Sequence, residues 1–232
     1  MRLLSSLGEA ASQLFFPHHC AVCGTDMLNQ DTEICWHCLG SLPATNFASL
    51  SGNPLEKIFW GRLSVQAATA LYFYTQNSLL QKATHAFKYH RNQALGIQLG
   101  RILGETLLHS GRFQVDLLVP VPLHPRKEKQ RGFNQAAVIC EGIRQVMKIP
   151  FQEGILRRPK PSTTQTNKGR IDRWTNMEGT FVVSNSETLA GKHCLLIDDV
   201  ITTGATLESC GIALLKVDNV KISIASLGTA SQ

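Results

Sequence analysis

One stretch of the chain, Leu195–Thr206 (LLIDDVITTGAT), restricts the possible folds more than any other. The apolar run that leads into it is continuous, which is typical of a strand whose two faces are both covered by helices. The run ends at Asp198 and Asp199, and small or hydroxylic residues then lead into a segment with helical periodicity at 205–217. The stretch therefore predicts a strand, a tight turn and a helix in an α/β fold with a parallel sheet.

Strands and helices alternate along the rest of the chain. We expect strands at 65–74, 115–122, 179–184, 191–199 and 220–228, and helices at 77–91, 93–110, 132–147 and 205–217. The turn-rich segment 42–63 is expected to link or wrap, and 154–181, which has no sustained period, is expected to be a long mobile loop. This alternation predicts a parallel sheet flanked by helices.

The chain is expected to contain two parts. Residues 1–45 should hold an amphipathic N-terminal helix and a small cysteine module, and residues 46–232 the α/β domain. Polar residues interrupt the start of the chain, so it does not read as a signal peptide. No apolar run approaches the ~20 residues that span a bilayer. We therefore expect a cytoplasmic protein without membrane insertion.

Four of the seven cysteines form two C-x2-C pairs separated by eleven residues: Cys20, Cys23, Cys35 and Cys38. Two such pairs can present four thiolates to one structural Zn²⁺. Disulfides and a redox C-x-x-C are weaker alternatives, because the chain lacks a signal peptide and the two copies lie close together. His18, His19 and His37 lie near enough to replace one thiolate. The remaining cysteines, Cys140, Cys194 and Cys210, are expected in the core.

The turn after the acid pair is suited to an anion. A helix N-terminus offers unpaired backbone N–H groups, and the hydroxyls of Thr202, Thr203 and Thr206 add donors. Gly204 is expected to let a phosphate approach closely, with Ala205 beginning the helix. Asp198 and Asp199 would repel phosphate, but they suit ribose hydroxyls, either directly or through hydrated Mg²⁺. Together these residues predict a ribose 5-phosphate site.

This stretch resembles the phosphoribosyl-pyrophosphate (PRPP) signature of type I phosphoribosyltransferases. The further motifs RGFNQA (131–136) and TTQTNKGRIDRWTNMEGTF (163–181), with the four-cysteine module, are similar to the ComF family of competence proteins. The resemblance implies a type I phosphoribosyltransferase-like fold, Mg²⁺ bound with PRPP, and Asp198 and Asp199 as catalytic residues. It also implies a pyrophosphate loop with the basic residues Arg126, Lys127, Lys129 and Arg131. The resemblance further implies a role in natural transformation, alongside other competence proteins such as a DNA-translocating helicase.

Basic residues are concentrated in one part of the chain. Residues 120–173 contain twelve Lys/Arg and four Asp/Glu, a balance of +8, whereas the whole chain carries +6. Such a one-sided segment favours a polyanionic partner. Basic groups beside an aromatic residue are a pattern for binding single-stranded DNA, and the candidates on the long loop are Arg157, Arg158, Lys160, Lys168, Arg170, Arg173 and Trp174. Tyr89 and Phe133 could also stack on bases, but both are expected in the core.

Three functions remain open from the sequence. The chain could be a DNA-uptake factor that uses PRPP and binds single strands, an active transferase with an unknown acceptor, or a PRPP sensor without catalysis. The basic loop could instead close over the PRPP site as a lid. His124 could act as an acid, although a lone histidine in a loop is more often structural.

Overall fold

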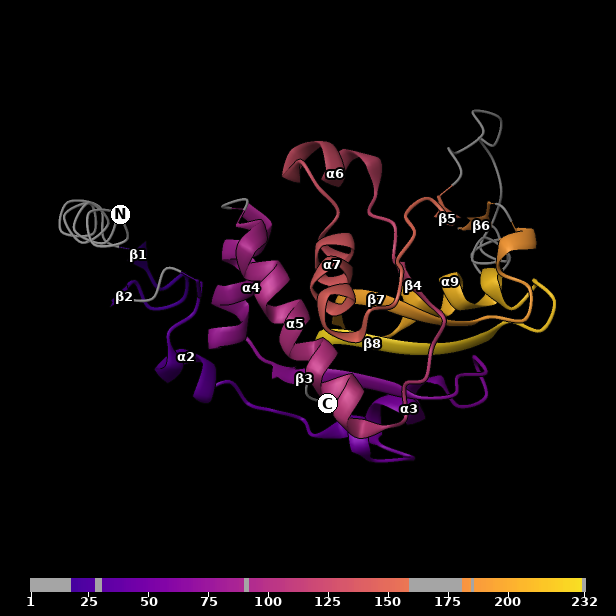
Figure 1. Ribbon diagram of the computed structural model, residues 1–232, viewed down its shortest axis with the longest axis horizontal. Helices are drawn as coiled ribbons and strands as arrows, with labels where there is room; N and C mark the ends of the chain where they lie inside the picture. Colours follow the sequence, from indigo (N-terminus) through magenta and orange to yellow (C-terminus); the bar gives the residue numbers. More distant parts are fainter. Residues whose placement is uncertain (1–17, 28–30, 90–91, 159–180, 185, 231–232) are drawn as a thin grey trace, which may run out of the picture.

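Four parallel strands form the central sheet, in the order β3-β8-β7-β4 (Figure 1). They are β3 (Ala68–Tyr74), β8 (Lys221–Ala230), β7 (His193–Ile201) and β4 (Leu117–Pro120). The computed structural model describes the chain except for residues 1–17, 28–30, 90–91, 159–180, 185 and 231–232. The predicted parallel α/β fold is confirmed.

Helices cover both faces of this sheet. The helices α4 (Leu79–Tyr89), α5 (Gln93–Ser110) and α7 (Gln135–Met147) pack on one face, and α3 (Pro54–Phe59) and α9 (Ala205–Leu214) on the other. In β7, Leu195 and Ile197 belong to the first core, whereas Cys194 and Leu196 belong to the second. Both side-chain directions of β7 are therefore buried, which explains its continuous apolar run.

Two segments that the sequence left without regular structure contain helices. The linking segment holds α3, which begins where the side-chain Oδ1 of Asn53 accepts from the N–H groups of Leu55 and Glu56. The segment after β4 holds α6 (Pro125–Arg131), which ends at Gly132 with φ 83°. Both helices have proline as their first residue, a position that suits its missing N–H. The cap, the proline and the final glycine were start and stop signals available in the sequence.

The remaining elements are short. β1 (His18–His19) and β2 (Asp26–Met27) form an antiparallel pair, and α2 (Trp36–Gly40) follows in the cysteine module. Single 3₁₀ turns lie at Phe47–Ser49 and Ser186–Thr188. The strand expected at 179–184 is only β6 (Val182–Val183), which pairs with β5 (Leu156–Arg157) outside the central sheet.

The cysteine module packs directly against the α/β body. Cys20, Ile34 and Cys38 are buried in the same core as residues of α4 and α5. The backbone N–H of Glu33 also donates to Oε1 of Gln98, at 2.7 Å. The predicted N-terminal helix lies outside the described residues, and the division at residue 45 remains a prediction. Among the described residues, no helix is both long and apolar enough to cross a membrane.

Candidate functional site

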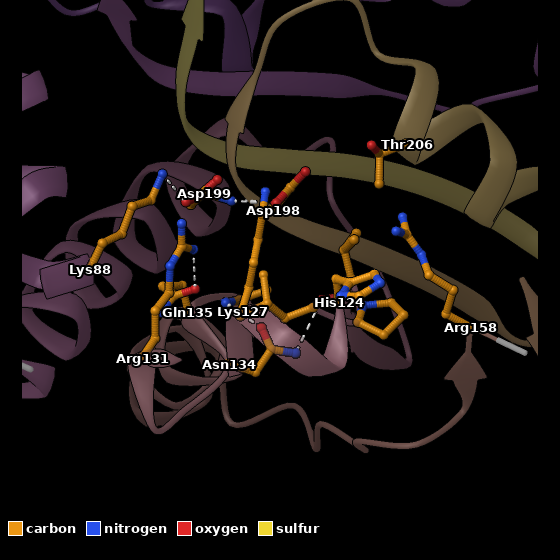
Figure 2. A pocket seen from close by; sticks show the side chains of 14 residues that line it. Lys88, His124, Lys127, Arg131, Asn134, Gln135, Arg158, Asp198, Asp199 and Thr206 are labelled. Carbon is orange, nitrogen blue, oxygen red and sulfur yellow. Dashed lines mark hydrogen bonds and ion pairs between the residues drawn. The ribbon is translucent and has the colours of Figure 1, made fainter. Parts of the chain in front are cut away.

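A pocket of about 220 Å³ lies at the end of the sheet to which the carboxyl ends of β4 and β7 point (Figure 2). Open parallel sheets bind their ligands at this edge. Four separate parts of the chain contribute charged or imidazole side chains to the pocket: Lys88, His124, Lys127, Arg131, Arg158, Asp198 and Asp199. The fold thus brings the predicted acid pair together with two of the predicted pyrophosphate residues, Lys127 and Arg131.

The acid pair is held by its own backbone and by one lysine. The N–H of Asp199 donates to Oδ1 of Asp198 at 2.8 Å, and the N–H of Val200 donates to Oδ1 of Asp199 at 2.7 Å. Oδ2 of Asp199 pairs with Nζ of Lys88 (Figure 2). Burial, reinforced by the charge of Asp199, raises the pKa of Asp198 to about 7. Carboxyl groups with pKa values shifted in this way, in a pocket, are typical of functional sites.

The turn that follows the acid pair encloses a smaller hollow of about 40 Å³. Asp198 and Thr206 line both spaces, so the hollow adjoins the main pocket; its other lining residues include Thr202, Thr203, Gly204 and Ala205. No side chain caps α9 from Gly204, and the nearest substitute is a long contact of 3.4 Å from the N–H of Ala205 to Oγ1 of Thr203. The first turn of α9 therefore retains N–H groups for an anion.

The expected reason for Gly204 is not the one that the structure shows. Gly204 is buried and has φ 74°, and a Cβ added to it would lie 3.0 Å from Cε1 of Phe59 and 3.3 Å from Cγ2 of Ile58. The residue is glycine because of its left-handed backbone and the packing of α3 beneath the turn. These two constraints require glycine whether or not a phosphate approaches.

The basic residues of α6 divide between pocket and solvent. Lys127 and Arg131, four residues apart, line the pocket, while Arg126 and Lys129 are exposed and do not. Nη1 of Arg131 donates to Oε1 of Gln135 at 2.8 Å. The predicted pyrophosphate loop is thus a short helix that presents two of its four cations to the pocket.

Two ring residues near α6, Tyr89 and Phe133, were both expected in the core. The guanidinium of Arg131 lies 5.6 Å from the ring centre of Tyr89, which is 53% exposed, so the prediction that Tyr89 is a core residue was wrong. Phe133 is partly buried against the core, with its ring 5.6 Å from that of Phe87.

His124 caps the start of α6. Its Nδ1 accepts from the N–H of Arg126 at 3.2 Å, so in a neutral ring Nε2 carries the proton.

The two described arginines of the long basic segment lie in different places. Arg158 lines the main pocket, and its guanidinium lies 4.9 Å from the ring centre of Phe181. Arg157 lines only a neighbouring space of about 310 Å³, and its Nε donates to the carbonyl of Gly154 at 3.3 Å. The other DNA-binding candidates, Lys160, Lys168, Arg170, Arg173 and Trp174, fall outside the described residues.

Two of the pocket residues that sequence reasoning missed are Lys88 and Asn134. The helix that carries Lys88 was predicted, but its last turn reaches the pocket only through the three-dimensional packing of α4. Asn134 was detectable, because an asparagine before an apolar-periodic run is a common N-cap. Its Oδ1 accepts from the N–H of Ala136 at 3.0 Å, while Nδ2 donates to the carbonyl of Val121 at 3.1 Å. Asn134 therefore ties the start of α7 to the chain leaving β4.

The four clustered cysteines fit a tetrahedral metal. Their Sγ atoms all lie within 4.8 Å of one another, and those of Cys23 and Cys35 are 3.8 Å apart. Tetrahedral Zn–S bonds of about 2.3 Å require sulfur atoms roughly 3.8 Å apart. The N–H of Cys35 donates to Sγ of Cys20 at 3.3 Å, and that of Cys38 to Sγ of Cys35 at 3.5 Å, as expected for thiolates. The cluster can therefore hold a metal such as zinc.

Neither histidine before the cluster replaces a thiolate. Nε2 of His18 lies 2.9 Å from the carbonyl of Thr32, and Nδ1 of His19 lies 2.8 Å from a carboxylate oxygen of Asp26. All seven cysteines lie in the described part of the chain and none forms a disulfide. The other three, Cys140, Cys194 and Cys210, are buried in the core as predicted.

Comparison with known proteins agrees with this geometry. Residues 134–231 match the family model of the phosphoribosyl transferase domain. The DNA utilization protein YhgH of Escherichia coli is 29% identical over 202 residues, which cover 85% of this chain and 84% of that protein. Competence protein F of Haemophilus influenzae is 26% identical over 220 residues, 93% of this chain and 86% of the relative. Competence protein ComFC of Bacillus subtilis is 25% identical over 202 residues, 82% and 81% of the two chains.

The parallel sheet, the acid pair at the end of β7 and the matching family model define a protein of the phosphoribosyltransferase-like class. Within that class, the match to competence protein F covers 93% of this chain, so it must include the cysteine module as well as the α/β body. These findings support a phosphoribosyltransferase-like protein of the ComF family, as its motifs indicated.

Proposed function

We propose that the chain binds PRPP together with Mg²⁺ in the pocket at the carboxyl edge of the sheet. The observation that carries this proposal is that two adjoining spaces share Asp198 and Thr206, one lined by acids and cations and the other lying at the start of α9. PRPP has a ribose between a 5-phosphate and a diphosphate, so it needs hydroxyl acceptors flanked by two anion sites. The acid pair with the α9 turn on one side and the cations of α6 on the other meets this need.

Each part of the pocket has a defined task in this proposal. The turn from Thr202 to Thr206 holds the 5-phosphate through N–H groups and hydroxyls. Asp198 and Asp199 accept hydrogen bonds from ribose hydroxyls, directly or through the water of a hydrated Mg²⁺, whose charge offsets that of the diphosphate. Lys127 and Arg131 face the diphosphate, and their charges stabilise it as it departs.

The same pocket would also suit either of two narrower functions, that of an active transferase or that of a PRPP sensor. An active transferase would pass the ribose 5-phosphate to an acceptor without an enzyme nucleophile, whereas a sensor would bind PRPP without breaking it. Release of pyrophosphate from PRPP distinguishes them, since only the transferase produces it when an acceptor is supplied. Zn²⁺ at the four cysteines has a structural task in either case, because a closed set of four thiolates leaves no position for a substrate.

We further propose that the protein acts in the cytoplasm during natural transformation, after DNA uptake begins. The names of its relatives, DNA utilization protein and competence protein, support this role. The exposed Arg157 and the segment that follows it would bind single-stranded DNA through phosphate contacts and stacking. Other competence proteins, such as a DNA-translocating helicase, are its expected partners.

Calorimetric titration with PRPP tests the central proposal. Binding should require Mg²⁺ and should weaken by at least about tenfold in Asp199→Ala and in Thr203→Ala, the loss expected for one charged or well-aligned hydrogen bond. Asp218→Ala, which removes an exposed acid outside the pocket, is the matched control and should bind normally. Circular dichroism should show all three variants folded. Unchanged PRPP affinity in both pocket variants would exclude this site.

A further inference from the structure

Both carboxylate oxygens of Asp199 have a partner, and one of these partners is the ammonium of Lys88. Oδ2 of Asp199 contacts Nζ of Lys88, and Oδ1 accepts from the N–H of Val200. Both side chains are largely buried, with exposed fractions of 19% for Lys88 and 17% for Asp199. A second cation that approaches Oδ2 must therefore compete with the ammonium, because two positive charges at one carboxylate oxygen repel each other.

Lys88 has fewer partners than Arg112, the cation of another ion pair in the fold. Arg112, which pairs with Glu56 at 2.7 Å, also donates to the carbonyls of Ala48 and Leu50, so its guanidinium is fixed from three sides. Among the described residues, the Lys88 ammonium has Asp199 as its sole partner. Its long stem leaves the last turn of α4 and lines the same pocket as Lys127 and Arg131 (Figure 2).

We propose that Lys88 occupies the Mg²⁺ position at the acid pair in the ligand-free protein, and that it moves to the diphosphate when Mg²⁺ and PRPP bind together. This inference rests on the proposed PRPP site. The ammonium is a compact charge with three donors, and it can exchange a carboxylate for a phosphate oxygen without moving the backbone. Lys88 thus acts as a positioning residue that links the two ligands.

The exchange makes Mg²⁺ and PRPP cooperative. Mg²⁺ alone must remove Lys88 from Asp199 and leave the ammonium without an anion. PRPP alone must draw Lys88 away and leave Asp199 without a cation. When both arrive, each satisfies the group that the other has released. Linkage then requires that each ligand raise the affinity for the other by the same factor.

The decisive measurement is binding of Mn²⁺, as a spectroscopic probe for Mg²⁺, to the whole protein without PRPP. Lys88→Gln should bind Mn²⁺ at least about fivefold more tightly than the wild type, the low end of coupling between linked sites. Lys88→Arg should stay weak, because it keeps the competing charge. Lys82→Gln, on the exposed face of the same helix, is the matched control for loss of one positive charge and should not change. Adding Asp199→Asn to Lys88→Gln should abolish the gain.

The second measurement is the cooperativity itself. In the wild type Mg²⁺ should raise PRPP affinity strongly, and in Lys88→Gln this factor should be smaller; the part that remains comes from direct binding of Mg²⁺ by the diphosphate. Equal Mn²⁺ affinity in wild type and a folded Lys88→Gln overturns the inference and leaves the PRPP site standing. If the wild type does not bind PRPP, the proposed function fails, and the Mn²⁺ result alone then decides whether Lys88 competes for the acid pair. A structural pair would lower stability in Lys88→Gln without raising Mn²⁺ affinity.

Discussion

Gly204, which immediately precedes α9, packs against Phe59 of α3: a Cβ on Gly204 would lie 3.0 Å from Cε1 and 3.1 Å from Cζ of that ring. Through this contact, a helix that lies about 140 residues earlier in the chain supports the turn Thr202–Thr206. The nearby Arg62 adds to this support, since it pairs with Glu208 of α9. The shape of the turn therefore depends on the docking of α3.

Gly204→Ala should lower the free energy of unfolding by about 1–2 kcal/mol from the left-handed backbone alone, and by more because of the contact with Phe59. Gly111→Ala is the matched control, because Gly111 also has positive φ but no atom within 4 Å of its Cβ position. Urea denaturation should show the larger loss for Gly204→Ala, and only this variant should lose PRPP. Equal losses in the two variants would contradict a role for Phe59.

Purified protein should contain one zinc per chain, and Cys20→Ser should release it and lower the melting temperature. Metal binding by four thiolates is coupled to folding, and this module packs on α5. Elemental analysis and thermal denaturation provide the measurements. Cys140→Ala, which alters a buried cysteine outside the cluster, should lose some stability and keep its zinc. Protein prepared without chelator that contains no zinc would refute the assignment.

Stability should depend on pH through Asp198. Its pKa is raised to about 7 in the folded protein, so the folded state holds this proton more tightly than the unfolded chain. Stability from this group is thus present below pH 4 and is lost as the pH rises towards 7 and above. Asp198→Asn, which stays neutral, should gain stability relative to wild type between pH 5 and 8, by about 1–2 kcal/mol after allowance for solvent in the pocket.

Chemical denaturation of wild type and Asp198→Asn at pH 5 and pH 8 measures this difference. Titrating groups remote from Asp198 are common to both proteins and cancel. A difference that does not change with pH would mean that Asp198 ionises normally.

Arg157→Glu and Arg158→Glu should separate DNA binding from PRPP binding. Arg158 lines the main pocket and Arg157 does not. Arg157→Glu should weaken single-stranded DNA with little effect on PRPP, whereas Arg158→Glu should also weaken PRPP. Fluorescence titrations against salt should give a log–log slope of about −0.7 per phosphate neutralised.

A further variant on the loop, Trp174→Ala, should cost ~1–3 kcal/mol of DNA affinity without a change in the salt slope, because it removes stacking and no charge. Cells bearing the Asp199 variant or the Arg157 variant should lose transformation. Normal DNA binding by Arg157→Glu, with PRPP binding lost, would instead identify the loop as a lid.

The sequence by itself determined the fold class, the strand–turn–helix at the acid pair and the membership of the four-cysteine cluster. These features are local. A strand with both faces buried needs an unbroken apolar run, and four thiolates on two short turns need only the spacing between them. The family resemblance assigned Lys127 and Arg131 to the same site as Asp198 and Asp199, and all four residues line one pocket.

Only the tertiary structure decided which distant groups complete that site. Lys88 reaches Asp199 because α4 and α5 pack as neighbours beside the sheet, and no periodicity in the sequence encodes where the last turn of α4 ends. Phe59 lies under Gly204, and Tyr89 is exposed beside Arg131, for the same reason. Contacts between residues far apart in the chain depend on how helices pack on the sheet, and that packing is set by the whole core rather than by any single segment.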